Sequence, residues 1–116
     1  IVVRLVGSEM CIRDRCTHTF LDAKAKQAFE DASKNMTDRE IFKMMKGERA
    51  EMLGHWRGED DFFFCHWFAE DDDAIIEHLD KVGFNALMIT MPNEMPIYMS
   101  NHKITDKTAE EMEKVN

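Results

Sequence analysis

The stretch Phe62-Phe-Phe-Cys-His-Trp-Phe-Ala69 decides the fold, because it is apolar on both faces apart from His66. A strand with this pattern normally lies in the centre of a sheet and is covered on both sides. Residues 52–57 form a second β-prone run, and residues 58–61, Gly-Glu-Asp-Asp, supply the turn chemistry of an antiparallel hairpin. The middle of the chain therefore predicts a central strand paired with its sequence neighbour.

Helical patterns lie on both sides of this hairpin. Asp22 can cap a helix that runs to about residue 34, and Thr37-Asp-Arg-Glu40 has the capping-box spacing that starts a second helix over residues 38 to about 46. After the hairpin, carboxylates at residues 71–73 suit a helix start, and Gly83 suits its end. Two helical regions thus flank the hairpin.

The remaining β-prone runs complete the pattern. Residues 16–21 predict a first strand and residues 84–91 a last strand, which gives the order βαββαβ. This order predicts a ferredoxin-like α+β fold, with a four-stranded antiparallel sheet and helices on one face, of the dimeric α+β-barrel type. The open face would be buried by homodimerisation through the sheets. The domain is expected to span residues 16–100, with residues 101–116 as a polar tail.

Residues 5–15, Leu-Val-Gly-Ser-Glu-Met-Cys-Ile-Arg-Asp-Arg, resemble a translated sequencing adapter. Read back into codons, the stretch is similar to a transposon-type library adapter, which suggests a metagenomic fragment whose native N-terminus is missing. On this hypothesis residues 1–15 are an artefact outside the domain and should pack poorly against it. The alternative is a short strand over residues 1–6 followed by a Gly-Ser turn.

Composition narrows the classes of partner. The chain has 116 residues, a net charge of −8 at pH 7 and three cysteines, which fits one small domain without a disulfide framework. An acidic surface argues against nucleic acid and anionic membranes, which attract basic patches. We therefore expect no nucleic-acid or membrane partner and a cytoplasmic location, although a missing N-terminus leaves secretion open.

Three side chains on neighbouring elements could carry chemistry: His55, Cys65 and His78. Imidazole and thiolate groups together suit a transition-metal ion such as nickel, zinc or copper. Their spacing forms no tight motif, and the alternative interpretation is a buried apolar cysteine with two boundary histidines. The hairpin register decides whether His55 joins Cys65 or His66, and the sequence leaves it open.

The same residues resemble a family of small ferredoxin-like proteins, long described as a domain of unknown function, that includes a bacterial nickel-binding protein. In that family a histidine precedes the hairpin turn, a cysteine lies in the next strand, and a histidine lies on the following helix near an Ala-Ile pair. Here these positions are His55, Cys65 and His78, beside Ala74-Ile75. The resemblance, over about residues 53–89, implies a small non-enzymatic protein that binds a nickel-like metal through these three side chains.

The chain also departs from that family. Residues 22–51 are longer and richer in methionine than the family's single helix, and residues 93–99 do not match its usual ending. Two other functions stay open: a small dimeric α+β-barrel enzyme of isomerase or oxygenase type, with His66 or His78 as proton carrier, and a ligand-free interaction module. No catalytic residue is assigned.

Two further groups of residues have simpler interpretations. Methionines at residues 88, 91, 95 and 99 could be soft copper ligands, but core and interface packing explains them more simply. His18 and His102 are expected to be exposed.

Overall fold

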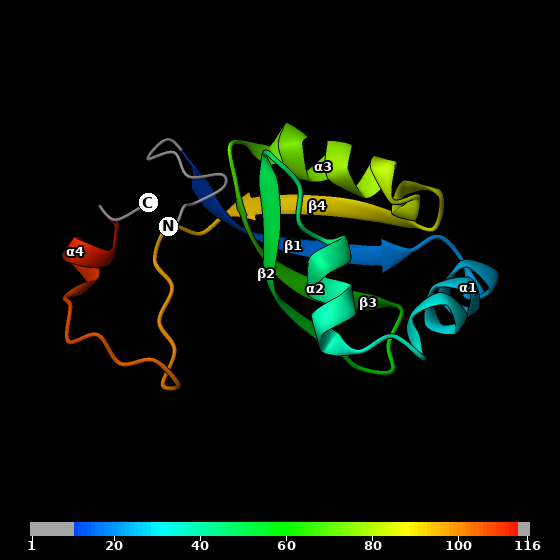
Figure 1. The fold of residues 1–116 in the computed structure, drawn as a ribbon, viewed down its shortest axis with the longest axis horizontal. Helices are drawn as coiled ribbons and strands as arrows, with labels where there is room; N and C mark the ends of the chain where they lie inside the picture. The colour runs from blue at the N-terminus through cyan, green and yellow to red at the C-terminus, as the bar shows by residue number, and fades with distance from the viewer. Residues whose placement is uncertain (1–10, 114–116) are drawn as a thin grey trace.

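The computed structural model describes residues 11–113 as an α+β fold around one four-stranded sheet (Figure 1). Its elements are β1 (Ile12–Phe20), α1 (Ala23–Ser33), α2 (Asp38–Met44), β2 (Ala50–Arg57), β3 (Phe62–Ala69), α3 (Asp72–Lys81), the 3₁₀ turn η1 (Phe84–Ala86), β4 (Met88–Glu94) and α4 (Ala109–Glu113). The strands are antiparallel neighbours in the order β2-β3-β1-β4. The predicted ferredoxin-like fold is confirmed.

The helices begin and end where their caps predict. The Thr37 hydroxyl accepts the Glu40 backbone N–H, and the Glu40 carboxylate accepts the Thr37 N–H, which completes the capping box. Asp22 and Asp71 cap α1 and α3 through side-chain bonds to the backbone. Gly83 follows α3 with a φ of 88°, a left-handed conformation that glycine adopts without a Cβ penalty.

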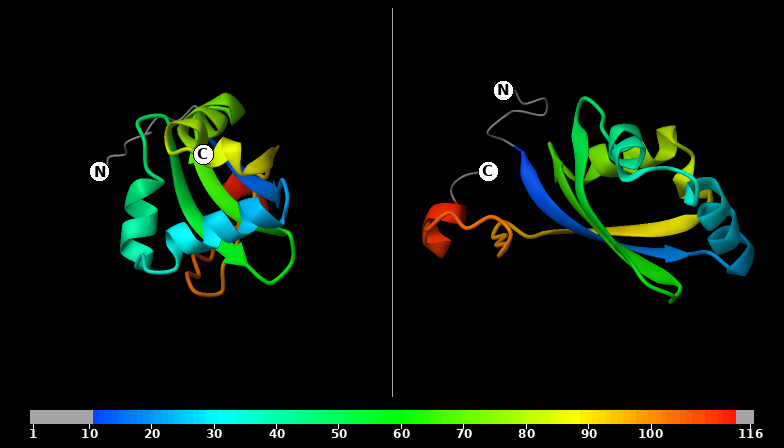
Figure 2. Two further views of the ribbon diagram at one scale, coloured as in Figure 1. Left: turned by 90° about the vertical axis from the view of Figure 1, so that its right-hand side faces the viewer. Right: turned by 60° about the horizontal axis from the view of Figure 1, so that its bottom comes forward.

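The sheet presents one face to the core. Alternate residues of β3, from Phe63 through Cys65 to Ala69, are buried on that face, and Cys16 and Phe20 of β1 join them. α3 runs along the sheet, and α1 lies beyond the end of β1, whereas the chain after β4 leads away to α4 (Figures 1 and 2). In the part of the chain that the structure describes, no helix has the length and apolar character to cross a membrane.

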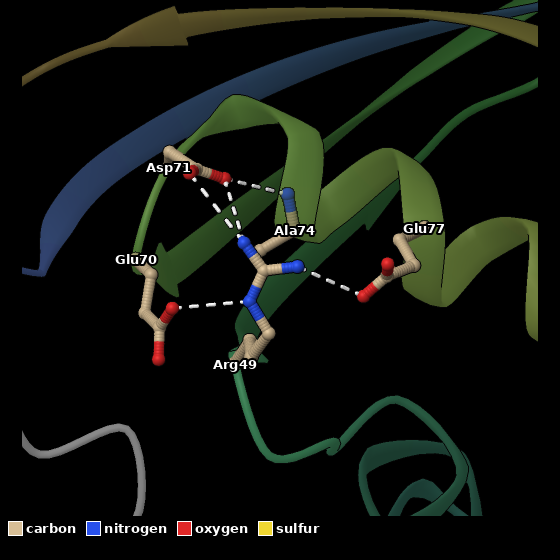
Figure 3. A network of polar contacts seen from close by, with 5 residues as sticks. All are labelled: Arg49, Glu70, Asp71, Ala74 and Glu77. Carbon is tan, nitrogen blue, oxygen red and sulfur yellow. Dashed lines mark hydrogen bonds and ion pairs between the residues drawn. The ribbon is translucent and has the colours of Figure 1, made fainter.

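An ion-pair network joins the start of β2 to α3 (Figure 3). The guanidinium of Arg49 donates to Glu70 at 3.0 Å and to Glu77 at 3.0 Å, and lies 3.5 Å from Asp71. Asp71 is also the N-cap of α3, because its side chain accepts the Ala74 N–H. One arginine thus ties the first turns of α3 to the strand that carries His55.

The first strand is longer than predicted. β1 begins at Ile12, and residues 12–15 pair with residues 66–69 of β3. Cys11 is buried, and Asp14 is 0% exposed. The expectation that residues 1–15 pack apart from the domain is therefore wrong for residues 12–15; residues 1–10 and the strand proposed for residues 1–6 lie outside the described residues. An adapter origin for residues 5–15 stays a prediction.

The last strand is shifted relative to the expected residues 84–91. Residues 84–86 form the 3₁₀ turn, and β4 continues past Pro92 to Glu94. Pro92 fits there because β4 is an edge strand, and within residues 11–113 its one strand partner is β1. The missing N–H of Pro92 therefore interrupts no second ladder.

Candidate functional site

A bulge in the hairpin brings His55 and Cys65 together. Met52 pairs with Trp67 but Gly54 pairs with His66, so Leu53 is one extra residue in β2. This insertion turns His55 to the core side of the sheet, directly opposite Cys65. The Nδ1 atom of His55 lies 3.3 Å from the Sγ atom of Cys65. The register that the sequence left open therefore pairs His55 with Cys65.

The pair borders a small cavity between the sheet and the helices. Its volume is about 30 Å³, enough for one or two water molecules. Besides the pair, the lining residues whose side chains carry possible metal-ligand atoms are His18, Ser33 and four methionines: Met44, Met45, Met52 and Met88. The organic ligands that proteins enclose usually need roughly 300 Å³ or more. The cavity therefore has the size for a single ion or for one or two water molecules.

His18 is a cavity residue that sequence reasoning placed at the surface. It is 1% exposed, stacks on Phe63 with ring centroids 4.6 Å apart, and has its Nδ1 atom 2.8 Å from the Thr90 hydroxyl. Among the described residues its Nε2 atom has no hydrogen-bond partner. The alternation of Cys16, His18 and Phe20 along β1 is the signal that could have predicted this burial.

Burial keeps the groups of the site neutral. It lowers the pKa of His55 to about 4, with a smaller contribution from Arg57, and lowers the pKa of His18 to about 4. Burial also raises the pKa of Cys65 to about 12, although Arg57 and the Trp67 indole act in the opposite direction. At neutral pH the site therefore holds a thiol and neutral imidazoles. It lacks the thiolate–imidazolium pair that activates a catalytic cysteine.

His78 does not lie where a metal ligand shared with His55 and Cys65 would have to lie. Its Nε2–H donates to the carbonyl oxygen of Met44 at 2.9 Å. A Cβ atom at Gly47 would lie 2.8 Å from its Nδ1 atom, so the segment after α2 packs closely on the ring. The structure does not bring His78 beside His55 and Cys65. Within residues 11–113, no three side chains from His, Cys, Asp and Glu are grouped to hold a metal ion.

His66 lies on the other face of β3. Its ring is 4.5 Å from that of Tyr98, and Arg13 donates to its Nε2 atom at 3.4 Å. It borders a surface groove with Trp56 and Phe64. His66 is therefore separated by the sheet from the cavity, and it cannot act together with Cys65.

Comparison of the chain with models of protein families, with curated proteins and with solved structures found no match. The resemblance to the small ferredoxin-like family therefore stays a prediction.

Proposed function

We propose that this protein is a non-enzymatic binding protein for a transition-metal ion, held by His55 and Cys65 at the wall of the cavity. The observation that carries the proposal is the 3.3 Å separation of the two donor atoms. An ion at the usual distances of about 2.0 Å from nitrogen and about 2.3 Å from sulfur would have an N–metal–S angle of about 100°, which is close to the tetrahedral value. The pair could thus bind an ion with little movement of the hairpin.

Binding fits the site better than catalysis. The cavity is too small for an organic substrate, and the thiol and imidazole are neutral. A neutral thiol can still become a metal ligand, because the metal ion displaces the thiol proton on binding. The reducing cytoplasm would keep Cys65 in this form.

We further propose that the protein acts as a homodimer through the open face of the sheet. Large apolar side chains on that face are 41–61% exposed: Trp56, Phe62, Ile89 and Met91. A second copy of the same face would cover them, since two-fold contacts match identical patches.

Equilibrium dialysis of the purified, reduced protein against nickel, zinc and copper ions tests metal binding. We expect one bound ion per chain, and its loss in Cys65→Ala and His55→Ala. His66→Ala is the matched control, because His66 belongs to the same hairpin but faces away from the cavity. Absence of uptake, or uptake that persists in a His55→Ala, Cys65→Ala double variant, would overturn the proposal.

A further inference from the structure

Four methionines, whose thioether sulfur atoms are soft metal ligands, line the cavity. Met45, Met52 and Met88 are buried in its walls, and Met44 is partly buried there. The N–H of Met52 donates to the carbonyl oxygen of Met45, so the end of α2 is fixed to β2 beside the hairpin bulge. Thioether sulfur is a polarisable ligand that favours monovalent copper, whereas the protein ligands of zinc are cysteine, histidine and carboxylate groups.

The net charge of the bound site also distinguishes monovalent from divalent ions. Among the described residues that line the cavity, Cys65 alone has a side chain that can become an anion, and Arg57 adds a cation. A divalent ion bound to one thiolate would leave a net positive charge in an apolar space, which costs free energy. A monovalent ion with one thiolate forms a neutral unit. The walls of this cavity therefore favour a monovalent ion.

His18 lines the same cavity, and its Nδ1 atom lies 2.8 Å from the Thr90 hydroxyl. Within residues 11–113, however, no three side chains from His, Cys, Asp and Glu are grouped to hold one metal ion. His18 is therefore a wall residue of the cavity, and the donors that join His55 and Cys65 are thioethers.

These observations rest on the proposed function and extend it. We infer that the bound ion is monovalent copper, held by the Cys65 thiolate and His55, with the buried methionine thioethers of Met52 and Met88 completing a four-coordinate site. On binding, Cys65 releases its thiol proton to solvent and the copper stays monovalent, so no redox step is involved.

The test compares metals and variants under anaerobic, reducing conditions. Cu(I) affinity is measured by competition with bicinchoninate, and Zn(II) and Ni(II) affinities by competition with a chromophoric chelator. We expect Cu(I) to bind more tightly than either divalent ion. Met52→Leu and Met88→Leu, which nearly conserve volume, should each weaken Cu(I) binding by at least about tenfold and leave Zn(II) affinity unchanged. His18→Gln should leave the Cu(I) affinity nearly unchanged, because His18 lines the cavity without joining His55 and Cys65 in one group of ligands.

Met99→Leu is the matched control, because Met99 is 63% exposed and lies outside the cavity. Circular dichroism establishes that each variant is folded before its affinity is compared. Zn(II) or Ni(II) binding through His55 and Cys65 that equals or exceeds Cu(I) binding would overturn the assignment of copper and leave the proposed function standing. Cu(I) binding that depends on Cys65 but is unchanged in the Met52 and Met88 variants would overturn the inferred thioether ligands. Absence of any metal binding that depends on Cys65 would remove both proposals.

Discussion

Gly47 packs directly against His78: a Cβ atom at residue 47 would lie 2.8 Å from the Nδ1 atom and 3.2 Å from the Cε1 atom of the ring. This contact, with the hydrogen bond from His78 to Met44, attaches the end of α2 to α3. The α2 end carries Met45 into the cavity wall. His78, which the family resemblance implies is a metal ligand, thus packs against the end of α2 and holds it in place.

Gly47→Ala should lower the free energy of unfolding by about 1–3 kcal/mol, because the added methyl group forces the His78 ring to move. In a His78→Ala background the same substitution should cost much less, since the ring is gone. Urea denaturation of the four proteins of this cycle measures the coupling. Gly58→Ala is the control, because a Cβ atom at residue 58 would meet no other atom within 4 Å. Equal costs in both backgrounds would refute the contact.

His78→Ala should lower stability by about 1–2 kcal/mol through the lost bond to the Met44 carbonyl, yet leave the metal content nearly unchanged. The structure places the ring outside the cavity lining, so its removal takes away no donor. Metal analysis and urea denaturation of one sample separate the two effects. A folded His78→Ala protein without metal would instead make His78 a ligand, as the family resemblance implies.

Asp14 should make the protein less stable as the pH rises. Burial, followed by Asp72 and Glu94, raises the pKa of this carboxyl to about 8 in the folded state. Between about pH 4 and pH 8 the folded protein therefore holds a proton that the unfolded chain has lost. Stability should then fall by up to about 1.4 kcal/mol per pH unit in this window, and the contribution of the neutral acid is fully present only below it.

Asp14→Asn removes this titration. The variant should gain stability relative to the original chain at pH 8 and should gain much less at pH 5. Urea denaturation at the two pH values gives the comparison, with Asp60→Asn in the exposed hairpin turn as control. A stability difference between Asp14→Asn and the original chain that is the same at both pH values would contradict the buried carboxyl.

Ile89→Glu should convert a dimer to a monomer, because it places a charge within the proposed apolar contact between open faces. Ile89 is 58% exposed in the single chain and lies on the edge strand β4. Sedimentation velocity over a range of micromolar concentrations measures the change, and Lys24→Glu on α1 is the charge control. An original chain that sediments as a monomer throughout would rule out the dimer.

Local sequence signals predicted most of the fold because they act within a few residues. The capping box at Thr37 and Glu40 and the caps at Asp22 and Asp71 each satisfy nearby backbone groups, and the structure confirms them. The hairpin turn also lies where it was predicted, between the end of β2 and the start of β3. The apolar residues on both faces of β3 also predicted correctly that this strand is central.

The site depended on relationships that the sequence does not encode locally. The register of His55 is set by the extra residue Leu53, and a bulge has no distinct sequence signature beyond the neighbouring Gly54. His18 is buried because β1 lies between β3 and β4, a long-range pairing. The same pairing draws residues 12–15 into the sheet, where backbone bonds to β3 hold them whatever their side chains prefer.

X-ray absorption spectroscopy at the absorption edge of the bound metal tests most directly whether His55 and Cys65 coordinate the ion. His55 and Cys65 predict a coordination shell with sulfur at about 2.3 Å and nitrogen at about 2.0 Å, and the loss of this shell in Cys65→Ala. A metal surrounded by oxygen and nitrogen alone, with the same spectrum in the Cys65→Ala protein, would contradict the account.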